Sequence, residues 1–168
     1  MANKNIKYSL RGFTIVELLV TLALTSLAIT FSYSTLTYIQ KLLYNYQKQN
    51  KFINEYTELI KRFDYESIFS TSVVEGSENR FLIKRDSTES ILEIFDRTIV
   101  FKKGTLCDTF HISAKKIVKE YEFMKNPKWT NKLLKYMEFE TDFSKQKFIV
   151  YFYKNYDSAI KLELEKEE

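Results

Sequence analysis

The most apolar stretch of the sequence begins abruptly at Phe13 and continues to Phe31. Residues 1–12 contain three cations and no acid, whereas residues 13–31 are dominated by leucine, isoleucine, valine and alanine. The length of this run is close to the ~20 residues that a helix needs to cross the ~30 Å hydrocarbon layer of a bilayer. Because cationic flanks stay on the cytoplasmic side, the pattern predicts one membrane-spanning helix with the rest of the chain exported.

Beyond Phe31 the apolar residues become less frequent and follow a helical periodicity, with intervals of three, four or seven positions. The stripe consists of Leu36, Ile39, Leu43, Tyr46, Ile53 and Ile60, widened by Leu42, Tyr56 and Phe63. No glycine or proline interrupts residues 13–75. The pattern therefore predicts a single helix that runs from the membrane to about Phe63, with its outer half packed on a globular head.

The spacing of the apolar residues changes from a helical to a strand-like pattern after Glu75-Gly76-Ser77, which we interpret as a loop. Short β-branched and aromatic runs follow at residues 81–83, 91–95, 98–101 and 110–112, and they predict strands of one antiparallel sheet. Residues 102–104 and Asn126-Pro127 are typical of turns. Residues 115–124 fit a helix or a strand.

The C-terminal third predicts a hairpin and a final strand. Residues 133–141 and 147–154 form the hairpin, with residues 142–145 between them. Ile160, Leu162 and Leu164 then alternate with charged residues, as in a half-solvated strand, and residues 165–168 form a solvated tail without a binding role. A long helix followed by an antiparallel sheet defines an α+β fold.

Composition supports one domain with a packed core, since 45% of the 168 residues are hydrophobic and 16% are aromatic. The net charge is +4, and Lys4, Lys7 and Arg11 supply three of these charges, which leaves +1 for the remainder. Such a weak excess disfavours a generic nucleic-acid-binding face.

The residue inventory does not point to catalysis. Cys107 and His111 are the only cysteine and histidine, so we predict no intramolecular disulfide, no metal site and no cofactor, with Cys107 a small core residue. The sequence has three glycines and none of the GxSxG, HExxH or phosphate-loop motifs. Carboxylates such as Glu66, Glu75 and Glu93 are interpreted as surface charges. We therefore predict that the chain is not an enzyme.

One acid stands inside the apolar run. Glu17 would place a carboxylate at membrane depth, which is costly unless a partner compensates the charge. Neither a secretory signal peptide, which would be cut after Ser26-Leu27-Ala28, nor a simple signal-anchor explains this acid. Both remain alternatives, although residues 13–31 exceed the usual apolar core of a signal peptide.

The contiguous segment from Arg11 to Val20, RGFTIVELLV, resembles the signature of type IV prepilins and type II secretion pseudopilins. The resemblance implies that a prepilin peptidase cuts between Gly12 and Phe13, and that Phe13 becomes N-methylated. It also implies that Glu17 pairs with the Phe13 amine of another subunit and so sets the axial register. A carboxylate removed from water is tolerated when it is paired in this way.

The resemblance covers about the first thirty positions. It implies a cleaved cytoplasmic leader (1–12), a transmembrane and fibre-core helix (13–34), and an exported α+β head (35–168) on the outside of the cytoplasmic (inner) membrane. The implied partners are the prepilin peptidase, other pilin or pseudopilin subunits, the inner-membrane assembly platform and, before assembly, membrane lipid. Many pilins carry a proline in the outer half of the membrane helix, where this chain has Ser32, Tyr33 and Ser34.

The expected function is that of a minor pilin or pseudopilin, a structural subunit of a type IV pilus or of a type II secretion or competence pseudopilus. An alternative is a DNA-binding or adhesive receptor at a pilus tip, and another is an unrelated membrane-anchored exported module. A DNA receptor would use a basic cluster formed by Lys115, Lys116, Lys119, Lys125, Lys128 and Lys132. A solvated face is the simpler interpretation of these lysines.

Overall fold

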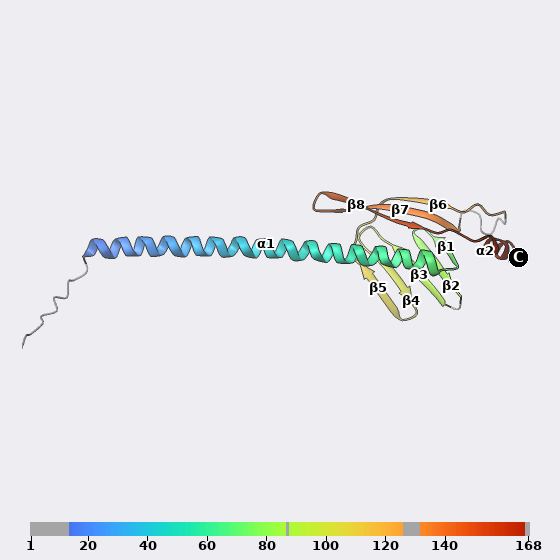
Figure 1. Cartoon of the computed structure of the whole chain (residues 1–168), viewed down its shortest axis with the longest axis horizontal. Helices are drawn as coiled ribbons and strands as arrows, with labels where there is room; N and C mark the ends of the chain where they lie inside the picture. The colour runs from blue at the N-terminus through green and yellow to red at the C-terminus, as the bar shows by residue number, and fades with distance from the viewer. Residues whose placement is uncertain (1–13, 87, 126–131, 167–168) are drawn as a thin grey trace, which may run out of the picture. The chain divides into compact units, whose positions relative to one another are not determined.

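The computed structural model describes residues 14–86, 88–125 and 132–166 (Figure 1). The chain divides into two units, Met1–Gln47 and Lys48–Glu168. Its elements are α1 (Ile15–Phe69), β1 (Ser72–Ser77), β2 (Arg80–Arg85), β3 (Thr88–Ile94), β4 (Ile99–Lys103), β5 (Leu106–Phe110), β6 (Lys115–Tyr121), β7 (Leu134–Phe143), β8 (Gln146–Tyr153) and α2 (Ser158–Lys166). The predicted α+β class is confirmed.

Helix α1 is continuous, as predicted, and ends at Phe69 rather than near Phe63. All described residues of the first unit are exposed. Among the described residues, α1 is the one helix long and apolar enough to cross a membrane, with a mean hydropathy of 2.0 over its most apolar window. A large exposed apolar surface of this kind requires lipid or neighbouring chains to cover it.

Strands β1 to β5 form one antiparallel sheet in sequential order. The predicted strands at 81–83, 91–95 and 98–101 correspond to β2, β3 and β4. The predicted strand at 110–112 is wrong, because β5 ends at Phe110 and residues 111–112 lie outside any strand. The predicted loop at residues 75–77 is wrong, because these residues end strand β1. Gly76 lies where the register shifts between Glu75 and Ser77, so it marks a bulge, while Asn79 takes the positive φ of the turn.

Strands β6, β7 and β8 form a second, three-stranded antiparallel sheet. The predicted hairpin is confirmed as β7 and β8, and β6 shows that residues 115–121 are a strand. The predicted turn at Asn126-Pro127 lies outside the described residues. The head therefore contains two sheets, where the sequence predicted one sheet and an additional hairpin.

The core of the second unit lies where α1 meets both sheets. Phe63 of α1 has its ring centroid 5.7 Å from that of Phe101 in β4, 6.2 Å from that of Phe139 in β7 and 5.9 Å from that of Phe152 in β8. Phe52, Leu59 and Phe63 carry the packing, whereas Ile53 of the predicted stripe remains 43% exposed. The packed face therefore keeps Tyr56 and Phe63 of the predicted stripe and adds Phe52 and Leu59, which the stripe did not include.

The last element is a helix and not the predicted strand. Ile160 and Leu164 are four positions apart, so they share one face of a strand and also one face of a helix. The sequence pattern is therefore compatible with both structures. Both pack into a small cluster with Met124, Leu133 and Tyr156, while Leu162 is left 56% exposed. The helical period, and not the alternation, decides which apolar residues are buried.

Strand β5 corrects the prediction for Cys107. The side chain is exposed, because β5 is an edge strand of the five-stranded sheet and only Phe110 among its residues is buried. Edge strands commonly present polar or small residues to solvent on both faces.

The hairpin between β7 and β8 offers a test of turn chemistry. Ser144 and Lys145 connect the paired Phe143 and Gln146, and both have positive φ, 48° and 70°. This is a type I′ geometry, which favours Asn-Gly. We expect Ser144→Asn with Lys145→Gly to raise the free energy of unfolding by about 1 kcal/mol, measured by urea denaturation. Unchanged or lower stability would contradict the assigned turn.

Candidate functional site

The N-terminus of α1 is closed by a reciprocal set of hydrogen bonds between Thr14 and Glu17. The Thr14 backbone N–H donates to Glu17 Oε2 at 3.0 Å, and the Glu17 N–H donates to Thr14 Oγ1 at 3.2 Å. The Thr14 hydroxyl also donates to Glu17 Oε2 at 3.1 Å. This is a capping box, in which residues three apart satisfy two backbone donors that the first helical turn leaves free.

The capping box explains why an acid is tolerated at the start of an apolar helix. The negative charge of Glu17 lies in the first turn, where the helix dipole is positive. Both contacts from Thr14 reach Oε2, and no described residue donates to Oε1. One carboxylate oxygen therefore serves the helix itself, and the other is open to a donor from outside the described residues.

Further along α1, the small polar side chains satisfy their own hydrogen-bonding groups. Their hydroxyls donate to backbone carbonyls three or four residues earlier, at 2.6 to 3.1 Å. These residues are Thr21, Thr25, Ser26, Thr30, Ser32, Ser34, Thr35 and Thr37. Satisfied hydroxyls can enter hydrocarbon at a much lower cost than unpaired ones.

The other predicted processing residues, Gly12 and Phe13, lie outside the described residues. They immediately precede the cap residue Thr14 in the sequence, so the predicted cleavage falls before the first helical turn. The T-x-x-E spacing of Thr14 and Glu17 is a capping signal in the sequence itself, whereas the prediction for Glu17 rested on its charge at membrane depth and on the prepilin resemblance.

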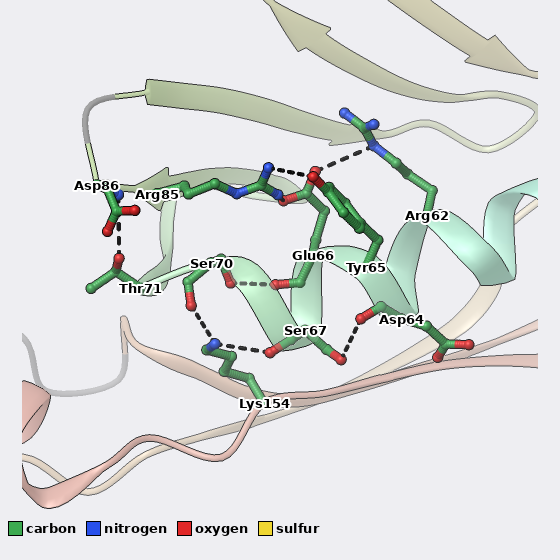
Figure 2. Close-up of polar contacts among 10 residues, drawn as sticks. All are labelled: Arg62, Asp64, Tyr65, Glu66, Ser67, Ser70, Thr71, Arg85, Asp86 and Lys154. Carbon is green, nitrogen blue, oxygen red and sulfur yellow. Dashed lines mark hydrogen bonds and ion pairs between the residues drawn. The ribbon is translucent and has the colours of Figure 1, made fainter.

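A second polar cluster, at the C-terminal end of α1, was not anticipated (Figure 2). Glu66 has a side chain only 3% exposed and lies between Arg62, at 3.3 Å, and Arg85 of β2, at 2.9 Å. The Arg85 guanidinium also donates to Tyr65 Oη at 2.9 Å and lies 4.5 Å from the centroid of that ring. The cluster joins the end of α1 to the five-stranded sheet.

Lys154, which follows β8, joins the same helix end to the three-stranded sheet. Its Nζ donates to the carbonyl of Ser67 at 2.8 Å and to the carbonyl of Ser70. The last turn of α1 has no basic residue of its own, so this ammonium supplies the positive charge that helix C-termini favour. Burial lowers the pKa of Lys154 below its ordinary value.

The prediction that Glu66, Glu75 and Glu93 are surface charges is wrong. Their side chains are 3%, 15% and 16% exposed, and each is in an ion pair. Glu75 of β1 accepts hydrogen bonds from Lys119, at 2.5 Å, and from the hydroxyl of Tyr121, so it links the two sheets. Burial disfavours the ionised carboxylate, but these hydrogen bonds outweigh it and hold the pKa of Glu75 below its ordinary value.

This lowered pKa predicts a pH-dependent link between the sheets. Because the folded-state pKa of Glu75 lies below its ordinary value of 4.5, its contribution to stability is complete above that value and is lost as pH falls through the folded-state pKa. We expect Glu75→Gln to unfold at a lower temperature than the native chain at pH 7, and we expect this difference to shrink progressively as the pH is lowered below 4.5. Thermal melts across this range measure the difference.

The neighbouring exposed Glu78, in the turn after β1, provides the control. Glu78→Gln is expected to leave both the melting temperature and its pH dependence unchanged. A constant difference between Glu75→Gln and the native chain at all pH values would contradict a role for Glu75 ionisation.

The structure pairs three of the six lysines proposed for DNA binding, while Lys125 and Lys132 are in no ion pair among the described residues. Lys115 Nζ lies 2.8 Å from Asp142 and Lys116 Nζ lies 3.0 Å from Glu140. Lys119 is engaged with Glu75, as described above. Lys128 lies outside the described residues. The three paired lysines are thus already matched by carboxylates, which favours the solvated-face interpretation.

Comparison with known proteins identifies the start of the chain. The family model of the prokaryotic N-terminal methylation motif matches residues 10–33. No curated protein and no solved structure gives a significant match. The motif, the apolar helix α1 and the antiparallel head together define a membrane-anchored precursor of the pilin kind. The chain is a type IV prepilin-like or pseudopilin-like protein.

Proposed function

We propose that the chain is a minor pilin or pseudopilin, a structural subunit rather than an enzyme, of a type IV pilus or a type II secretion or competence pseudopilus. The observation that carries this proposal is Glu17, a carboxylate capped by Thr14 at the start of an otherwise apolar, exposed helix within the matched motif. In this proposal residues 1–12 are the leader, residues 13–34 form the membrane and fibre-core segment, and residues 35–168 form the exported part.

The proposed assembly step uses the open oxygen of Glu17. Prepilin peptidase cuts between Gly12 and Phe13, and the new amine of Phe13 on one subunit donates to Glu17 Oε1 on another. The Thr14 bonds to Oε2 can persist during this step, so the helix keeps its cap while the partner is engaged. Pairing neutralises both charges, and its geometry selects one axial register.

The rest of α1 supports lateral packing. Its apolar residues before Lys48 are exposed, and bundling them in a fibre core replaces lipid contacts by protein contacts. Small hydroxyl residues that hydrogen-bond to their own helix allow neighbouring helices to approach closely. The proposed location is a cytoplasmic membrane with the N-terminus inside and the head outside, before incorporation into the fibre.

The test is the N-terminal mass and sequence of the mature protein from cells with and without prepilin peptidase. The expected mature chain begins at N-methylated Phe13 only when the peptidase is present. A chain that begins at Ile29, as after a signal-peptide cut at Ala28, would overturn the proposal. An intact Met1 in both strains would overturn it as well.

A further inference from the structure

The outer face of the three-stranded sheet carries an unusual concentration of aromatic side chains. Tyr136 of β7 is directly opposite Tyr153 of β8, and Tyr151 is opposite Glu138. On the other side of β7, Glu120 of β6 is opposite Tyr136. We call these five residues the tyrosine face. Residues paired across antiparallel strands have Cβ atoms about 4.5–5.5 Å apart, so the five side chains form one continuous surface.

Strand alternation shows that this surface points away from the core. The residues that alternate with them along β7 and β8, including Met137, Val150 and Phe152, are at most 3% exposed. In contrast, Tyr151 is 58% exposed and Tyr153 is 51% exposed. Clustered exposed aromatic residues mark interaction sites, and tyrosine is enriched where proteins bind one another.

The charge on the tyrosine face is not compensated within the described part of the chain. Neither Glu120 nor Glu138 is in an ion pair there, and the contact made by Glu138 is a hydrogen bond from the Tyr136 hydroxyl. The opposite end of the same sheet face differs, because Glu140 is 3.0 Å from Lys116 and 3.5 Å from Lys147. The acidic character is therefore confined to the end that also carries the tyrosines.

We propose that the tyrosine face binds an exposed protein segment that carries arginine or lysine. The cation lies over a tyrosine ring, where the ring face attracts it, and its N–H groups donate to Glu120 or Glu138. A flat aromatic surface also suits a neutral glycan, whose hydroxyls can donate to carboxylates, but a glycan would leave both negative charges uncompensated. The docking surface is distinct from Glu17 and from the helix contacts proposed for assembly.

The test measures binding of a fluorescent hexa-arginine peptide to the full chain in non-ionic detergent, by fluorescence anisotropy. The double variant Glu120→Gln, Glu138→Gln is expected to weaken binding about tenfold. The matched control is Glu58→Gln, Glu163→Gln, which removes two exposed charges from α1 and α2 that have no ion pair among the described residues. This control is expected to bind like the native chain.

A second pair of variants tests the aromatic contribution without changing charge. Tyr151→Thr with Tyr153→Thr keeps β-forming residues and is expected to weaken peptide binding severalfold. If Glu120→Gln, Glu138→Gln and the control Glu58→Gln, Glu163→Gln weakened peptide binding equally, the proposal would be overturned. The peptide would then be attracted only by the overall charge of the protein. Binding of labelled maltohexaose that depends on the tyrosines, without binding of hexa-arginine, would overturn it in favour of a glycan surface.

Discussion

Replacement of Glu66 by alanine is expected to lower the free energy of unfolding by about 3 kcal/mol. The carboxylate lies between Arg62 and Arg85, whose side chains are only 27% and 21% exposed. Without Glu66, these two like charges lie close together at the end of α1, and no other acid among the described residues is within ion-pair distance of them. Urea unfolding of the full chain in non-ionic detergent, followed by near-ultraviolet circular dichroism, measures the loss.

The control is Glu58→Ala, which removes an exposed acid from the same helix and is expected to cost less than about 0.5 kcal/mol. Glu66→Gln keeps the shape and part of the hydrogen bonding to Arg85, so its stability is expected to fall between those of the native chain and Glu66→Ala. Similar stabilities for Glu66→Ala and Glu58→Ala would refute the structural role of the cluster.

The second large effect is expected from Glu17→Leu. This variant should insert into the membrane and be cleaved, since an apolar residue suits the helix and leaves Gly12 and Phe13 intact. Its recovery in sheared fibres, relative to total cellular protein, should fall at least about tenfold. A tenfold fall corresponds to a loss of ~1.4 kcal/mol in assembly free energy. Quantitative immunoblots of both fractions measure the ratio.

Thr14→Val separates the two contacts of this carboxylate. It removes the hydroxyl half of the capping box but leaves Glu17 charged and able to accept from a neighbouring subunit. We expect fibre incorporation of Thr14→Val to remain within about twofold of native. If Thr14→Val lost as much incorporation as Glu17→Leu, the acid would be acting through its own helix and not through register.

Local sequence patterns predicted the elements whose signals are local. The unbroken helix follows from the absence of glycine and proline, and the β7–β8 hairpin from two apolar runs around a short polar turn. The errors occurred where one pattern fits two structures. Ile160 and Leu164 satisfy both the strand and the helix period, and Gly76 marks a bulge as readily as a turn.

The residues of the candidate site also differ in whether a local sequence signal marks them. Glu17 could be chosen as a candidate from the sequence because an acid in an apolar run is anomalous wherever the chain folds, and its role in assembly stays a prediction. Glu66 and Lys154 were missed because their environments depend on distant segments. Arg85 is 19 positions from Glu66, and Lys154 is 87 positions from the Ser67 carbonyl that it caps. Such partners become apparent only when the sheets are placed around α1.

The contact between Lys154 and the end of α1 joins the helix to a residue that is synthesised much later. Synthesis proceeds from the N-terminus, so α1 emerges long before the residue that satisfies the carbonyls of Ser67 and Ser70. Any fragment that stops before Lys154 lacks the ammonium that binds these two carbonyls, although Phe63 can still pack on the second sheet. The last turn of α1 therefore gains its cationic cap only after β8 has been synthesised, so this helix end and the second sheet are completed together.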